Sequence, residues 1–109
     1  MVLATIRMTI SARKFGEALR ILRSVAERSR VQPGCLSCQV YRNGQEDNVL
    51  MFEQIWRTEG TLNLYLQSDE YRNVLLVMEM ALKQPEVRFN TVSTATGIET
   101  IEKARSSNR

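Results

Sequence analysis

Apolar and polar residues alternate over the first ten positions, and this period of two predicts a β-strand over about residues 2–10 with one buried face. The apolar face holds Val2, Ala4, Ile6, Met8 and Ile10. The spacing then changes to that of an amphipathic helix, expected over about residues 13–30. Its apolar positions are Phe15, Ala18, Leu19, Leu22, Val25 and Ala26. Gln-Pro-Gly at positions 32–34 ends this helix, because proline disfavours helical backbone before it and glycine permits a turn.

Two further strands are expected at about 35–43 and 48–57, joined by a polar, glycine-containing connection of the hairpin type. In the first, alternation places Leu36, Cys38 and Val40 on one face. The second is apolar on both sides: one face holds Val49, Met51 and Ile55, and the other holds Leu50, Phe52 and Trp56. Strands of this kind are usually buried on both faces.

The rest of the chain predicts helices at about 58–67 and 69–82, a strand at about 86–95 and a last helix at about 98–105. In the strand, alternation places Val87, Phe89 and Thr91 on one face. The last helix has Ile98 and Ile101 as its large apolar residues.

The order β-α-β-β-α-β, followed by a C-terminal helix, is that of the ferredoxin-like split βαβ fold. We therefore predict an α+β protein with a single domain over residues 1–109, one antiparallel four-stranded sheet and helices on one face. The doubly apolar strand requires cover on the other face as well, and no remaining segment is large enough to supply it. Because a large exposed apolar face marks an interface, we expect a homodimer in which two sheet faces pack together.

Charge and composition narrow the class of function. A net charge of +3 arises from basic and acidic residues spread along the chain, unlike the clustered basic patches of nucleic-acid binders. The alternating N-terminus is unlike a signal peptide, and no run approaches the roughly 20 apolar residues of a membrane span. We expect a cytoplasmic protein that binds neither nucleic acid nor membrane. The chain contains no histidine, which removes the commonest general base and metal ligand.

The two cysteines, Cys35 and Cys38, have the spacing of a C-x-x-C motif but fall in a predicted strand. On a strand they lie about 10 Å apart and point to opposite faces, whereas a disulfide needs Cα atoms within about 7 Å. Thioredoxin-type motifs begin a helix, and zinc needs two further ligands. We expect Cys38 to be a core residue and Cys35 to lie on the face that meets a partner chain.

Several strings along nearly the whole chain carry a resemblance to a known family. They are PGCLSCQVYRN at 33–43, NVLMFEQIW at 48–56, LNLYLQSDEYRNVL at 62–75, PEVRFNTV at 85–92 and TGIETIEKAR at 96–105. With the order of elements, they resemble the antibiotic biosynthesis monooxygenase family, which forms dimeric α+β barrels on the ferredoxin-like fold. The haem-degrading relatives use an Asn, a Trp and a His, whereas this chain has Arg7 in the first strand and Tyr65 at the spacing where many relatives carry the His. The resemblance therefore implies no haem site.

The quinol- and anthrone-oxidising relatives are more similar to what this chain retains. The resemblance implies oxidation of an electron-rich aromatic ring by O2, in which a deprotonated substrate passes an electron to O2 directly. Such chemistry needs an apolar pocket, a proton acceptor and donors for the developing oxyanion. We expect no haem, metal or flavin as cofactor.

Two residues are candidates for catalysis, Tyr65 and Glu53. Tyr65, at the position of the relatives' His, can donate a hydrogen bond to a substrate oxygen, or it is a half-buried helix residue with its hydroxyl in water. Glu53 lies between the apolar Met51 and Ile55, where a raised pKa would make it a base. The alternative for Glu53 is a salt bridge to an arginine at the rim of the dimer.

Four residues are candidates for binding the substrate: Trp56, Phe52, Tyr71 and Arg88. Trp56, the only tryptophan, either stacks on an aromatic substrate or fills the core or the dimer interface. Phe52 and Tyr71 have core packing as their alternative role. Arg88, like Arg7, lies on the polar face of its strand and either binds an anionic group or is solvated.

Two functions remain open on this sequence. One is a cofactor-independent monooxygenase or oxidase of quinol- or anthrone-like compounds. The other is a non-catalytic dimeric α+β barrel protein that binds a small apolar ligand or has a structural role, because a fold does not imply a function. An enclosed pocket with Tyr65 or Glu53 pointing into it would favour the enzyme.

Overall fold

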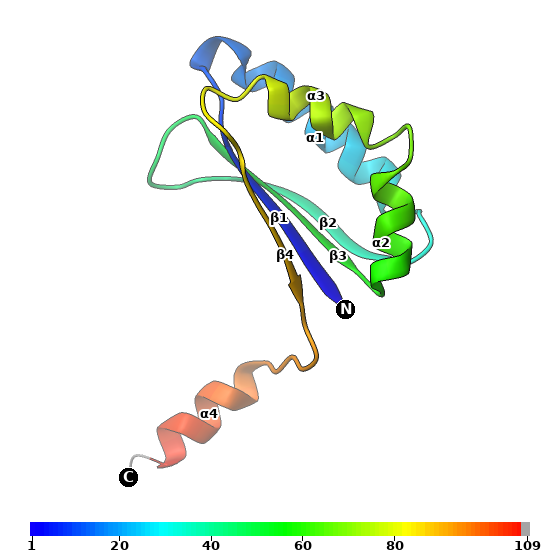
Figure 1. Ribbon diagram of the computed structural model, residues 1–109. Helices are drawn as coiled ribbons and strands as arrows, with labels where there is room; N and C mark the ends of the chain where they lie inside the picture. The colour runs from blue at the N-terminus through cyan, green and yellow to red at the C-terminus, as the bar shows by residue number, and fades with distance from the viewer. Residues whose placement is uncertain (108–109) are drawn as a thin grey trace.

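A computed structural model describes residues 1–107 and shows the expected order of elements (Figure 1). The elements are β1 (Val2–Thr9), α1 (Ala12–Ser29), β2 (Cys35–Arg42), β3 (Val49–Trp56), α2 (Glu59–Leu66), α3 (Arg72–Glu79), β4 (Glu86–Thr91) and α4 (Ile98–Ser107). The strands form one antiparallel sheet in the order β2-β3-β1-β4. This is the ferredoxin-like α+β arrangement, and α1, α2 and α3 lie on one face of the sheet (Figure 1).

The alternation of apolar and polar residues in β1 puts its apolar side chains on the face that the helices cover. In β1, Val2, Ala4, Ile6 and Met8 are buried and the residues between them are partly exposed. The register pairs Ile6 with Phe52 on β3 and with Val87 on β4, so these three side chains share the helix face. The stripe of α1 packs onto this face. Burial of each large apolar side chain there contributes about 1.5–3 kcal/mol.

The other side of the sheet, which we call the open face, has no helix over it in the described part of the chain (Figure 1). On β3 it carries Met51, Glu53 and Ile55, all partly exposed. The expectation that both faces of β3 are apolar is therefore confirmed, and only one of them is covered within the described chain.

Strand β2 departs from simple alternation. Its pairing with β3 shifts between Cys35 and Ser37, so Leu36 is the extra residue of a β-bulge and is 46% exposed. Cys35 pairs with Trp56 and Cys38 with Gln54, two positions on the same face of β3. The expectation that the two cysteines point to opposite faces, with Cys35 toward a partner chain, is therefore wrong. The same bulge removes Leu36 from the face of Cys38. Both cysteines are free thiols.

Two elements end earlier than their patterns predict. Helix α3 ends at Glu79 because the chain turns to join the edge of the sheet, where the Leu82 N–H donates to the Thr9 carbonyl at 2.9 Å. Strand β4 ends at Thr91. After it, Val92 and Met1 continue the pairing with two hydrogen bonds between their backbone nitrogens and carbonyl oxygens. In the described residues no helix is both long and apolar enough to cross a membrane.

Candidate functional site

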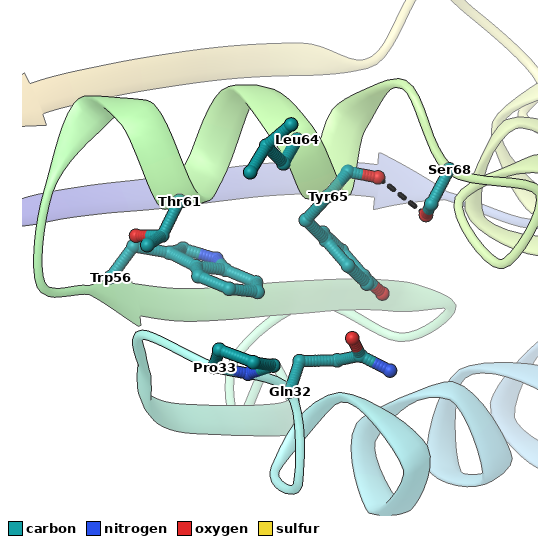
Figure 2. A pocket seen from close by; sticks show the side chains of 7 residues that line it. All are labelled: Gln32, Pro33, Trp56, Thr61, Leu64, Tyr65 and Ser68. Atoms are coloured by element: carbon teal, nitrogen blue, oxygen red, sulfur yellow. Dashed lines mark hydrogen bonds between the residues drawn. The ribbon is translucent and has the colours of Figure 1, made fainter.

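A pocket of about 260 Å³ lies between α2 and the turn that joins α1 to β2 (Figure 2). Its lining residues are Gln32, Pro33, Trp56, Thr61, Leu64, Tyr65 and Ser68. Figure 2 shows Trp56 at the end of β3, the Tyr65 ring hanging from α2, and Gln32 and Pro33 facing them from the turn. Aromatic rings, a proline and a leucine make the pocket mostly apolar, and the polar groups are amide and hydroxyl groups.

The Pro-Gly turn determines how closely α2 approaches the sheet. Gly34 has φ +86°, a conformation that favours glycine, and a Cβ there would lie 2.5 Å from side-chain atoms of Thr61. The Gly34 carbonyl accepts the Arg57 N–H at 2.8 Å, which ties the turn to the end of β3. On the other side, the Thr58 hydroxyl accepts the Thr61 N–H at 3.1 Å and caps α2. These contacts hold the two walls of the pocket in place.

Three aromatic side chains pack in a row beside the pocket. The rings of Trp56 and Tyr65 lie 4.8 Å apart between centroids, tilted by 32°. Tyr71 meets Tyr65 edge to face, with centroids 5.6 Å apart and an interplanar angle of 83°. Both are favourable aromatic geometries, so the Tyr65 ring is held from two sides and has little freedom to rotate.

A buried polar cluster lies beneath these rings. The Tyr65 hydroxyl and the Ser29 Oγ are 2.6 Å apart in a hydrogen bond. Trp56 Nε1 donates to Gln54 Oε1, and Gln54 Nε2 donates to the Cys38 Sγ, each at 3.4 Å. Ser29 and Gln54 are 0% and 2% exposed. Such groups are costly to bury unless they are hydrogen-bonded, and here they hold the two aromatic walls.

Ser29 and Gln54 are functional candidates that we did not identify from the sequence. A signal was present, because Ser29 continues the apolar stripe of α1 after Val25 and Ala26, and Gln54 alternates with Phe52 and Trp56. A polar residue on a buried face needs a hydrogen-bond partner.

Burial raises the pKa of the Tyr65 phenol, and hydrogen bonds from Ser29 and Gln54 only partly oppose this. The phenol therefore stays protonated at neutral pH and can donate a hydrogen bond. Burial also raises the pKa of Tyr71 to about 12 and that of the Cys38 thiol to about 11, so neither is ionised near pH 7.

The predicted site residues lie in three places: beside the pocket, in the core and on the open face. Trp56, Tyr65 and Tyr71 come together, and Phe52 lies in the core on the same face of the sheet. Glu53 lies on the open face, beside Thr5 of β1, and Arg88 lies on the far side of Thr5 on β4. Neither Glu53 nor Arg88 reaches the pocket. Within residues 1–107, no three His, Cys, Asp or Glu side chains come together as a metal site.

The fold and this pocket define a small α+β protein with an aromatic-walled pocket between α2 and the turn that joins α1 to β2. A family model described as "Antibiotic biosynthesis monooxygenase" matches residues 1–75, and the chain belongs to that family. The expected resemblance is thus confirmed.

Solved structures agree on the fold. A protein from Deinococcus radiodurans, provisionally assigned as an antibiotic biosynthesis monooxygenase, superposes with a TM-score of 0.82 at 16% identity, over 90% of this chain and 98% of that one. A conserved protein from Methanosarcina mazei has a TM-score of 0.76 at 21% identity, over 82% and 89% of the two chains.

One relative is more similar in sequence. It is an uncharacterised protein from Synechocystis, 33% identical over 52 residues, which make up 48% of this chain and 35% of that protein. The chain thus spans only about a third of the length of this curated relative.

Proposed function

We propose that the protein is a cofactor-independent monooxygenase or oxidase that acts with O2 on an aromatic quinol- or anthrone-like small molecule. The observation that carries this proposal is the pocket whose walls are Trp56 and Tyr65, with the phenol held by Ser29. Its volume of about 260 Å³ is below the roughly 300–1,000 Å³ of pockets for drug-sized ligands. It therefore suits a hydroquinone of one or two rings better than the three fused rings of an anthrone.

The aromatic walls bind the substrate ring by stacking, and Tyr65 supplies a hydrogen bond to a substrate oxygen. No lining residue of the pocket in the described chain carries a carboxylate, an amine or an imidazole. The proton acceptor is therefore water, and the ionisation of the substrate's own hydroxyl supplies the reactive anion. As an oxidase, the protein would pass two electrons and two protons from the quinol to O2, which leaves as H2O2. As a monooxygenase, it would place one oxygen atom on the ring and release the other as water. The two electrons and two protons for that water come from the substrate itself, which leaves as the quinone.

The same proposal includes a homodimer through the open face. Support comes from Met51 and Ile55, which lie on that face without cover in the described chain. Two copies that pack these faces together would bury the second side of β3. A mass measurement by light scattering at micromolar concentration tests this part, and a mass of one chain would contradict it.

Substrate binding and turnover can be measured separately because Trp56 is the only tryptophan. A panel of hydroquinones and anthrones is added while tryptophan fluorescence and O2 consumption are recorded. We expect quenching and O2 uptake with the wild type, and quenching with at least tenfold slower uptake in Tyr65→Phe. Glu53→Gln, on the open face, serves as the matched control and keeps the wild-type rate. O2 uptake that is unchanged in Tyr65→Phe would remove Tyr65 from the mechanism.

A binding protein without catalysis is the second candidate, and the absence of an ionisable base among the lining residues of the described pocket favours it. Quenching of Trp56 without O2 uptake across the whole panel would support that function and contradict the enzyme. Neither quenching nor uptake would contradict both.

A further inference from the structure

The C-terminal helix α4 presents apolar side chains that nothing in the described chain covers. Figure 1 shows it standing away from the sheet and from α1, α2 and α3. Ile98 is 70% exposed and Ile101 is 60% exposed. Isolated helices shorter than about 12–15 residues are marginal in water, and α4 has 10 residues. A helix of this length needs a surface to pack on.

The start of α4 is well defined by local contacts. The Gly97 N–H donates to the Glu99 Oε1 at 2.7 Å, and the Thr100 hydroxyl donates to the Thr96 hydroxyl at 2.6 Å. The bond to Gly97 also lowers the pKa of Glu99, because it favours the charged carboxylate. These contacts fix where the helix begins, but they leave its apolar side uncovered.

The body of the protein has a groove of about 370 Å³ that matches this need. The groove lies between α2 and the strands β1 and β4, and its lining residues are Val2, Glu59, Leu62, Asn63, Leu66, Phe89 and Thr91. Phe89 is on the helix face of the sheet but remains 49% exposed. The groove is thus an apolar channel with an acidic side chain at the end where α2 begins.

The two surfaces match in length and in the order of their side chains. Along the groove, α2 presents Glu59, Leu62 and Leu66. On α4 the corresponding stripe is Ile98, Ile101 and Arg105. Each stripe spans eight residues, and its first and last residues lie roughly 10.5 Å apart along the helix axis. In an antiparallel arrangement, each isoleucine meets a leucine and the arginine meets the glutamate.

We propose that α4 of one copy docks in the groove of a second copy, and that two copies exchange these helices. The groove of the same chain is a poorer fit, because pairing with Met1 holds the chain in line with the sheet for one residue after β4 ends at Thr91. The Val92 N–H donates to the Met1 carbonyl at 2.7 Å, and this pairing carries the chain past the end of the sheet, from where α4 runs away from the body (Figure 1). Reciprocal exchange closes a symmetric dimer at low cost. This inference does not depend on the proposed function.

Charge reversal can distinguish exchange from docking within one chain. In Glu59→Arg the contact becomes arginine against arginine, and in Arg105→Glu it becomes glutamate against glutamate. When the two variants are mixed, a heterodimer restores opposite charges at both of its contacts. The two folded variants are therefore mixed, incubated and examined by native mass spectrometry. Exchange predicts a heterodimer fraction well above the roughly one half that random association gives.

A matched control uses Lys103, which lies on the opposite side of α4 from the stripe. Lys103→Glu makes the same change of charge as Arg105→Glu, and its mixture with Glu59→Arg should show no preference for the heterodimer. Circular dichroism of each variant checks that it is folded. A random heterodimer fraction for the Glu59→Arg and Arg105→Glu mixture would overturn the proposal in favour of docking within one chain or no docking. A wild type that is monomeric at all concentrations would overturn it as well.

Discussion

The two faces of the sheet are built from alternate residues of the same strand, yet they differ completely in how they are stabilised. On β3, Phe52, Gln54 and Trp56 are at most 2% exposed beneath the helices, and Gln54 and Trp56 are hydrogen-bonded there. Their neighbours Glu53 and Ile55 lie on the open face and are partly exposed. The helix face is buried within one chain, and its residue Trp56 also lines the pocket. The apolar residues of the open face stabilise the protein only when a second copy of the chain packs on them. Four measurements test this difference.

Truncation of Trp56 should have the largest effect. Trp56→Ala removes a fully buried side chain, together with its ring contact to Tyr65, and should lower the free energy of unfolding by about 3–5 kcal/mol. Ile55→Ala, one residue away on the open face, is the matched variant and should cost less at nanomolar concentration. Denaturant unfolding followed by circular dichroism measures both. Equal losses at nanomolar concentration would contradict the distinction between the two faces.

Removal of the hydroxyl of Ser29 should have the next largest effect. Ser29→Ala leaves the buried Tyr65 hydroxyl without the Ser29 Oγ, its hydrogen-bond partner at 2.6 Å, and should cost about 1–3 kcal/mol. Ser24→Ala serves as the control, because the Ser24 hydroxyl accepts from Arg28 near the surface of α1 and its removal should cost little. In a double-mutant cycle with Tyr65→Phe, the cost of Ser29→Ala should shrink. An unchanged cost would show that the bond does not stabilise the fold.

This polar cluster also shows where sequence reasoning stops. Hydrophobic periodicity identified the order of the elements and the buried stripes, because burial imposes the period on each element separately. It could not pair Ser29 with Tyr65, which is 36 residues away, because a pairing depends on how α1 and α2 pack. For the same reason it missed the bulge at Leu36, a single extra residue that reverses the side of Cys35. Likewise, it placed Glu53 near an apolar surface. It could not predict on which side of the sheet the pocket forms.

Raised pKa values on the helix face predict a loss of stability at alkaline pH. Burial raises the pKa of Tyr71 from 10.0 to about 12 and that of Cys38 from 9.0 to about 11. Between these values the unfolded chain loses protons that the folded chain retains, so ionisation favours unfolding as pH rises. Stability should therefore be constant up to about pH 9 and fall between pH 9 and 12. Tyr71→Phe should make the fall above pH 10 shallower in denaturant titrations at each pH, whereas an identical slope would contradict this assignment.

The smallest effect is expected on the open face, at the ion pair of Arg7 with Glu46. Arg7 Nη2 lies 2.9 Å from Glu46 Oε2, and the two side chains are 25% and 61% exposed. Because water and salt screen such a pair, Glu46→Gln should cost no more than about 1 kcal/mol, and less at high ionic strength. Asp69→Asn breaks a still more exposed pair and should have no measurable effect.

If the open face is buried in a dimer, the cost of Glu46→Gln should rise with protein concentration, since Arg7 would then lose solvent on association. A cost that is the same at nanomolar and high micromolar concentration would show that Arg7 stays in water, and the open face near Arg7 would then lie outside any interface.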